Sequence, residues 1–143
     1  MKQNLPPVIK LRERLLVDIE LAVRRFARFH KYTFGSDLRT QAMNVTRLAY
    51  RAWNDREHRA AWIGSLVTAV DELKLSLQLG SKIKAFTSFG QFEVLARNAL
   101  DLGRQVGGWK KKQHPMGQNS SHRNAAECAP ILSTHTASIE AKI

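Results

Sequence analysis

Apolar residues recur at alternating spacings of three and four in four separate stretches of this chain. That spacing aligns apolar side chains along one side of an α-helix, and no stretch competes with it by alternating as a strand does. The expected helices cover about residues 8–31, 37–54, 56–79 and 88–109. The connections are short, so consecutive helices should run antiparallel. The predicted fold is an all-α, up-down antiparallel four-helix bundle.

The apolar side of each expected helix provides the predicted core. The stripes are Val8, Leu11, Leu15, Ile19, Ala22, Phe26 and Phe29; Leu38, Ala42, Val45, Leu48, Ala49, Ala52 and Trp53; Trp62, Ile63, Leu66, Val67, Val70, Leu73 and Leu77; and Phe89, Phe92, Leu95, Ala96, Ala99, Gly103 and Val106.

Local signals suggest where the helices begin and end. Gly35 should break the chain before the second helix, with Ser36 as its N-cap, and Ser88 is the expected N-cap of the fourth. Gly80-Ser81 weakens the end of the third helix, although Ile83 could extend it. The fourth is expected to end at Gly107-Gly108-Trp109, just before a run of three lysines.

The chain of 143 residues is long enough for one domain with its own core. We expect residues 1–112 to form the bundle and 113–143, rich in Ser, Thr, Asn, Gln, His and Ala, to be a disordered low-complexity tail. A single cysteine, Cys128, suits a reducing compartment. Neither a secretion signal nor an apolar run of roughly 20 residues is seen, so a soluble cytoplasmic protein without a membrane partner is expected.

The formal net charge is +11, and the excess is confined to the expected bundle. Residues 1–112 contain 21 Lys and Arg against 10 Asp and Glu, whereas residues 113–143 are balanced. A basic folded surface is typical of proteins that bind a polyanion, and nucleic acid is the favoured class. The alternative is a soluble cationic surface without a specific ligand.

Basic side chains on the outward sides of the helices are the candidate nucleic-acid contacts. Arginine outnumbers lysine by 13 to 10, and its planar fork matches phosphate geometry. Such contacts would reach backbone phosphate and read little sequence. Lys110, Lys111 and Lys112 could instead serve only the dipole of a helix C-terminus. The basic residues within 24–31 have fewer acidic neighbours and are the better candidates for RNA contact. The candidates are Arg14, Arg24, Arg25, Arg28, Lys31, Arg39, Arg47, Arg51, Arg104, Lys110, Lys111 and Lys112.

Residue patterns typical of catalysis or of cofactor binding are missing from the sequence. The histidines and the cysteine lack metal-ligand spacing, and no glycine-rich phosphate loop follows a strand. We therefore expect no catalytic residue, no metal and no cofactor. The enzymatic alternative is a helical ribonuclease of the HEPN type, in which an arginine precedes a histidine by a few residues. The pairs with that spacing are Arg24 or Arg25 with His30, and Arg51 with His58.

Two features bear on self-association. Leu75 and Leu79 form a second apolar edge on the third helix, off its core stripe. Small residues, among them Gly103 and Gly107, make one side of the fourth helix thin. Both features could serve packing inside the bundle or contact in a homo-oligomer.

Four short motifs resemble one protein family. They are Tyr32-Thr-Phe-Gly35, Asp71-Glu-Leu-Lys74, Phe89-Gly-Gln-Phe-Glu93 and Gly103-Arg-Gln-Val-Gly-Gly-Trp109. Over residues 28–112 the chain is similar to the accessory variability determinant (Avd) proteins of diversity-generating retroelements, and to related bundles encoded in intervening sequences of 23S ribosomal RNA genes. Phe92 stands where that family usually has tyrosine.

The resemblance implies a function that composition does not. Family members are non-enzymatic, basic four-helix bundles that assemble as homopentamers. They bind a reverse transcriptase and the template RNA, and they support mutagenic cDNA synthesis. The ribosomal branch implies a structural RNA-binding bundle without a polymerase partner.

Overall fold

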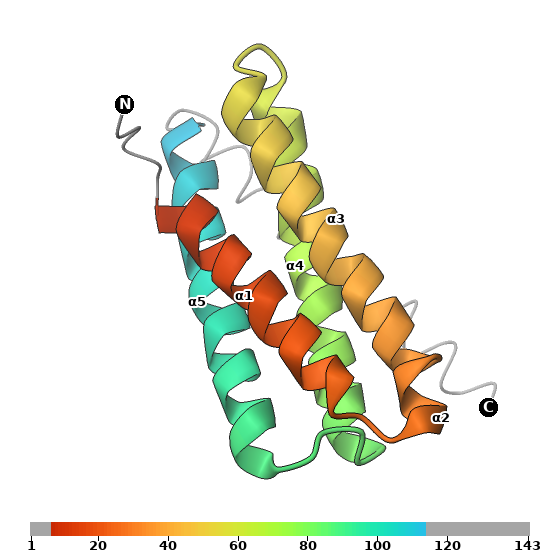
Figure 1. Cartoon of the computed structure of the whole chain (residues 1–143). Helices are drawn as coiled ribbons and strands as arrows, with labels where there is room; N and C mark the ends of the chain where they lie inside the picture. Colours follow the sequence, from red (N-terminus) through yellow and green to blue (C-terminus); the bar gives the residue numbers. More distant parts are fainter. Residues whose placement is uncertain (1–6, 114–143) are drawn as a thin grey trace, which may run out of the picture. The chain divides into compact units, whose positions relative to one another are not determined.

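The computed structural model describes residues 7–113, which contain four long helices and one short one (Figure 1). They are α1 (Pro7–Arg24), α2 (Arg28–Lys31), α3 (Phe34–Asn54), α4 (Arg59–Lys82) and α5 (Phe89–Gln113). Consecutive long helices run in opposite directions, and no strand occurs in this part of the chain. The predicted all-α bundle is confirmed. Apart from Gln113, which ends α5, the tail expected over 113–143 lies outside the described residues.

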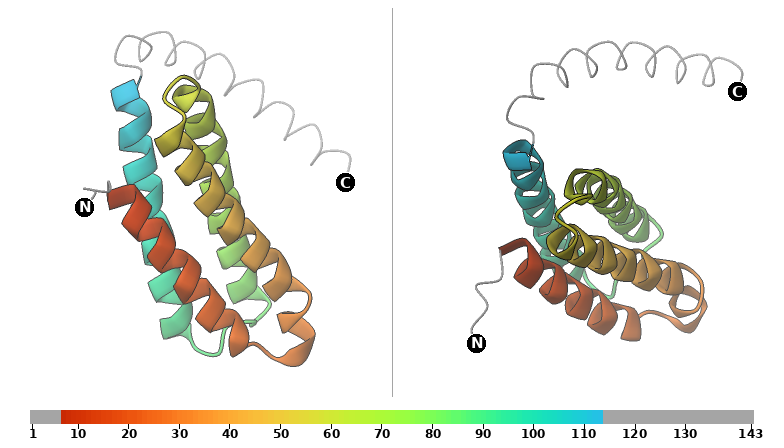
Figure 2. Two further views of the ribbon diagram at one scale, coloured as in Figure 1. Left: turned by 45° about the horizontal axis from the view of Figure 1, so that its top comes forward. Right: turned by 90° about the horizontal axis from the view of Figure 1, so that it is seen from above.

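The four long helices surround one apolar core in the order α1, α3, α4, α5 (Figure 2). Among the predicted stripe residues, only Phe29 and Phe89 are exposed, at 71% each. The other stripe residues are buried or half-buried, so the helical period correctly identified the inward side of each helix. The largest fully buried side chains are Leu15, Ile19, Leu38, Ile63, Leu66, Leu73, Leu77, Leu95 and Leu102.

The first helix ends earlier than the periodicity predicts. α1 ends at Arg24, and Ala27 has φ −56° and ψ 147°, outside the helical region. The turn brings Phe26 into the core, where its ring lies 6.1 Å from that of Phe34 and 5.3 Å from that of Phe86. The same turn rotates Phe29 out of the expected stripe. An aromatic cluster of Phe26, Phe34 and Phe86 thus lies where this helix ends.

Gly35 and Gly80 allow close approach rather than ending helices. A Cβ on Gly35 would lie 2.8 Å from Val23 Cγ1, and one on Gly80 would lie 2.7 Å from the Phe34 ring. Gly35 lies inside α3, and α4 continues past Gly80 to Lys82. Ser36 is inside α3 as well, so the predicted cap and chain break at 35–36 are wrong.

The last helix begins as predicted but ends later. The Gln91 backbone N–H donates to Ser88 Oγ over 3.2 Å, which confirms Ser88 as the N-terminal cap. α5 then passes through Gly107-Gly108-Trp109 to Gln113, and no glycine of the described part has a positive φ. The double glycine does not end the helix because its backbone stays in the ordinary helical region. In this part of α5 the buried side chain is Leu102, whereas the predicted stripe had Gly103.

No helix in residues 7–113 combines the length and the apolar character that crossing a membrane would require.

Candidate nucleic-acid interface and the α3–α4 turn

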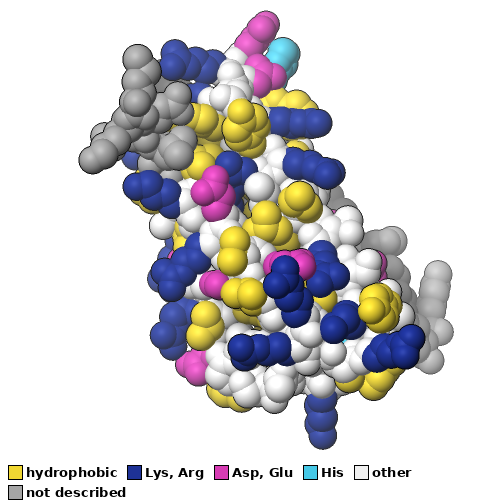
Figure 3. Space-filling view, in the orientation of Figure 1, with side chains coloured by type: hydrophobic (Ala, Val, Ile, Leu, Met, Phe, Trp, Pro, Cys, Tyr) yellow, Lys and Arg dark blue, Asp and Glu magenta, His cyan; other side chains and the backbone are white. Residues whose placement is uncertain are grey.

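Five of the predicted contacts lie where α1, α2 and the start of α3 meet, and we call this group the basic corner: Arg24, Arg25, Arg28, Lys31 and Arg39. Figure 3 shows Lys and Arg side chains gathered over this end, with few Asp or Glu among them. Arg25 and Arg28 are exposed and Lys31 is half-buried. None of these three makes an ion pair within residues 7–113.

Glu20 partly neutralises the other two members of the basic corner. Its Oε2 lies 2.8 Å from Arg39 Nε, and its Oε1 lies 3.6 Å from Arg24 Nε. One carboxylate on α1 thus draws together an arginine of α1 and one of α3. The Arg24 side chain is exposed, so its ion pair contributes little to stability and its guanidinium group can still turn toward phosphate, whereas Arg39 is half-buried.

A loop from the other half of the bundle adjoins the basic corner. Thr87 Oγ1 donates to the Arg25 carbonyl over 3.4 Å, which places the α4–α5 connection beside the end of α1. Lys82, the last residue of α4, and Lys84 in this connection are both exposed. The sequence did not single them out because only the tertiary fold brings residues 62 positions apart into contact.

The remaining predicted contacts are distributed over other surfaces. Arg14 and Arg104 are exposed and pair with Asp18 at 3.9 Å and Asp101 at 3.7 Å. Arg47 is exposed further along α3. Lys110, Lys111 and Lys112 are exposed in the last turns of α5, where cations also favour the helix dipole. The structure therefore does not unite all candidates into one face.

Arg12 is a buried cation that the sequence reading missed. It is 5% exposed, its Nη1 donates to the Thr46 carbonyl, and its guanidinium lies 5.7 Å from the Tyr50 ring centre. Desolvation lowers the pKa of Arg12, and the charge of Glu13 opposes that shift. Its position between Val8 and Leu15 on the apolar stripe was the available signal. Arg12 joins α1 to α3 and is not a surface contact.

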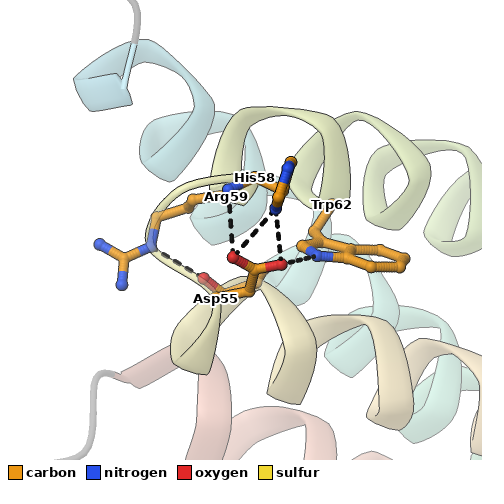
Figure 4. Close-up of polar contacts among 5 residues, drawn as sticks. Asp55, His58, Arg59 and Trp62 are labelled. Carbon is orange, nitrogen blue, oxygen red and sulfur yellow. Dashed lines mark hydrogen bonds and ion pairs between the residues drawn. The ribbon is translucent and has the colours of Figure 1, made fainter.

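The turn between α3 and α4 is organised by Asp55 (Figure 4). Its carboxylate accepts hydrogen bonds from the Trp62 indole over 3.0 Å and from the His58 backbone N–H over 3.2 Å. His58 Nδ1 lies 3.1 Å from Asp55 Oδ2. The Trp62 bond, followed by the His58 backbone bond, lowers the pKa of Asp55 because both stabilise the charged carboxylate.

Arg59 closes the same turn from its other side. Its Nε donates to the Ala52 carbonyl and its Nη2 to the Trp53 carbonyl, both over 2.8 Å. These bonds satisfy carbonyl groups in the last turn of α3. The guanidinium carbon lies 5.7 Å from the Trp53 ring centre and 5.9 Å from that of Trp109. A cleft of about 360 Å³ adjoins it, lined by Trp53, Asn54, Arg56 and Arg59.

The arginine–histidine pairs considered for a ribonuclease differ in whether their side chains share contacts. The Arg51 guanidinium carbon lies 5.1 Å from the centre of the Trp62 ring, and Trp62 shares Asp55 with His58. Arg51 and His58 therefore belong to one contact group. The His30 ring instead lies against Phe29, with 3.9 Å between ring centres. Within residues 7–113 no group of three or more His, Cys, Asp or Glu side chains is placed to hold a metal ion.

The fold and these surfaces define the class of protein: an all-helical bundle with a basic corner and a tryptophan–arginine turn. No family model, no curated protein and no solved structure matches the chain.

Proposed function

We propose that the protein is a non-enzymatic RNA-binding bundle whose basic corner contacts the phosphate backbone. The observation that carries the proposal is the convergence of five cations from α1, α2, α3 and the α1–α2 turn, next to the α4–α5 connection with Lys84 and the end of α4 with Lys82. Glu20 is the carboxylate paired with this group within the described residues. Such a density of arginine forks favours a closely spaced series of phosphates over a single anion.

The resemblance to Avd proteins narrows this proposal. We propose template RNA of a diversity-generating retroelement as the bound RNA and a reverse transcriptase as the protein partner, in support of mutagenic cDNA synthesis. The support is the motif 103–109 together with the three weaker motifs, and the bundle and basic corner fit the same function. The runner-up is the structural RNA-binding bundle of the ribosomal intervening-sequence type.

RNA affinity at varied salt concentration tests the basic corner. We expect the logarithm of the binding constant for single-stranded RNA to fall linearly with the logarithm of salt, by about 0.7 per neutralised phosphate. The double variant Arg25→Glu/Arg28→Glu should weaken binding and flatten that slope. The control Lys10→Glu/Arg97→Glu changes net charge equally on exposed sites of α1 and α5. Equal losses in both double variants would contradict the assignment of the basic corner.

A second candidate function, ribonuclease activity, is favoured by the contact between Asp55 and His58. A histidine held through Nδ1 by a carboxylate presents Nε2 as a general acid or base, and Arg51 lies in the same contact group. RNA cleavage that His58→Ala abolishes and His30→Ala preserves would support this candidate. RNA that stays intact with the unmodified protein would eliminate it and leave the binding proposal in place.

A further inference from the structure

We propose that the cleft beside the α3–α4 turn binds one nucleotide unit, with its phosphate on Arg56 and Arg59 and its base against Trp53. This inference deepens the RNA binding proposed above, and it depends on side chains outside the basic corner. The ligand chemistry is a phosphate joined to a planar base. Its source is either an unpaired residue of RNA or a free mononucleotide.

The lining of the cleft fits an anion with a flat group attached. Two arginines, one tryptophan and one asparagine form its walls, and no carboxylate is among them. The nearby carboxylate of Asp55 is directed toward His58 and Trp62, while Arg59 extends to the opposite side of the turn (Figure 4). The volume of about 360 Å³ lies within the range of small-molecule sites.

Arg59 is held in place before any ligand arrives. Two carbonyl groups fix its Nε and Nη2, and its guanidinium lies against two tryptophan rings. Within residues 7–113 its hydrogen bonds leave the Nη1 group free for a ligand. An arginine whose conformation is already restricted loses less entropy when it binds phosphate, and its planar fork suits that anion.

The other three side chains supply what a nucleotide needs. Arg56 is exposed and makes no ion pair within the described residues, so it can reach a second phosphate oxygen. Asn54 donates through Nδ2 to the Tyr50 carbonyl over 3.1 Å, which leaves its Oδ1 to accept from a base amino group. Trp53 provides a ring of the kind on which unpaired bases stack.

Titration of the full chain with AMP, followed by nuclear magnetic resonance of indole and guanidinium N–H groups, tests the site directly. We expect saturable shifts of the Trp53 indole and Arg59 Nε–H signals, with Trp62, which is held by Asp55, as the internal control. Inorganic phosphate and adenosine should each bind at least about tenfold more weakly than AMP, because each offers only half of the contacts. Equal shifts at Trp53 and Trp62 would overturn the proposal, as would phosphate that binds as tightly as AMP.

Charge reversal provides the matched comparison. Arg56→Glu should weaken AMP binding by about tenfold or more, because a charged hydrogen-bond donor is replaced by a repulsive carboxylate. Arg97→Glu makes the same substitution at an exposed position of α5 and should leave AMP binding unchanged. An unchanged affinity in Arg56→Glu, with helicity preserved, would refute the cleft as the nucleotide site.

Longer ligands show whether the nucleotide comes from RNA or is free, and they test the cleft separately from the basic corner. A short single-stranded RNA should shift the Trp53 indole signal at a lower concentration than AMP does, and blunt duplex RNA should not shift it. That result would assign the cleft to unpaired residues of RNA. AMP that binds at least as tightly as the strand would assign it to a free nucleotide. RNA binding that depends on Arg25 and Arg28 without any shift at Trp53 would reject the cleft alone. AMP binding without salt-dependent RNA affinity would reject the proposed function alone.

Discussion

At the residue scale, identical glycines have opposite roles in this bundle. Gly80 is buried where α4 meets the rings of Phe34 and Phe86, whereas a Cβ on Gly107 would have no neighbour within 4 Å. The sequence shows only that both are glycines. Their difference depends on what lies opposite each of them in the folded chain.

The same substitution should therefore have opposite effects at the two positions. Gly80→Ala should destabilise the fold by about 1–3 kcal/mol because the new methyl group meets packed aromatic rings. Gly107→Ala should stabilise it by about 0.5–1 kcal/mol because alanine is the better helix former. Urea denaturation of both variants measures the difference. A Gly80→Ala protein as stable as the parent would contradict the close packing described at that position.

A second prediction at the residue scale concerns Asp55 and the dependence of folding stability on pH. Its pKa is lowered in the folded state, so its contribution to stability is present above the ordinary pKa of about 3.9 and is lost as pH falls through the folded value. Asp55→Asn should be less stable than the parent at neutral pH. Denaturation curves at several pH values should show the gap narrowing as pH falls below about 4. A gap that does not depend on pH would mean that the carboxylate charge is unimportant for the turn.

At the element scale, the serine signals at two helix starts had different outcomes. Ser88 caps α5 through the Gln91 N–H, while Ser36 lies inside α3 because that helix begins two residues earlier, at Phe34. The ring of Phe34, the first residue of α3, packs in the aromatic cluster with Phe26. A local cap signal cannot anticipate such a distant partner.

Replacing each serine by alanine tests this distinction. Ser88→Ala should cost about 1 kcal/mol of unfolding free energy because the first turn of α5 loses a hydrogen-bond acceptor. Ser36→Ala is an exposed substitution within a helix and should change stability by less than about 0.5 kcal/mol. Chemical denaturation of the two variants side by side measures both effects. Equal costs would indicate that Ser36 has a capping function that its position in α3 does not show.

At the scale of the whole molecule, α4 and the residue that follows it present an apolar stripe that the described bundle does not cover. Leu75, Leu79 and Ile83 follow one another at four-residue spacing and are 56%, 46% and 45% exposed. The second apolar edge expected from Leu75 and Leu79 is thus on the surface of the described chain. Such a stripe fits the homo-oligomer proposed from the family resemblance, with a pentamer as the expected state.

Light scattering tests that assembly. We expect a pentamer at micromolar concentration, and Leu75→Glu/Leu79→Glu should dissociate it because charged side chains cannot be buried in an apolar contact at low cost. Val17→Glu/Leu21→Glu replaces two exposed apolar residues on α1 and provides the control. A monomeric parent protein would contradict the proposed assembly and weaken the argument from the resemblance.

The candidate sites were only partly predictable from the sequence. Exposure of Arg14, Arg24 and Arg47 follows from the helical period, since charged residues opposite an apolar stripe face solvent. The pairing of Arg39 with Glu20 was not predictable, because it joins residues on two helices. Nor was the cleft at the α3–α4 turn, where Arg59 contacts Trp109 across fifty positions of sequence.

The amino-acid sequence alone determined the helical class, the inward sides of the four long helices and the excess of positive charge. These properties are local or additive, so spacing and composition are sufficient to infer them. The tertiary structure decided where α1 ends, why Gly80 is a glycine, and which arginines meet at the basic corner and around Trp53. Those outcomes depend on contacts between segments far apart in the chain, and no local pattern specifies such contacts.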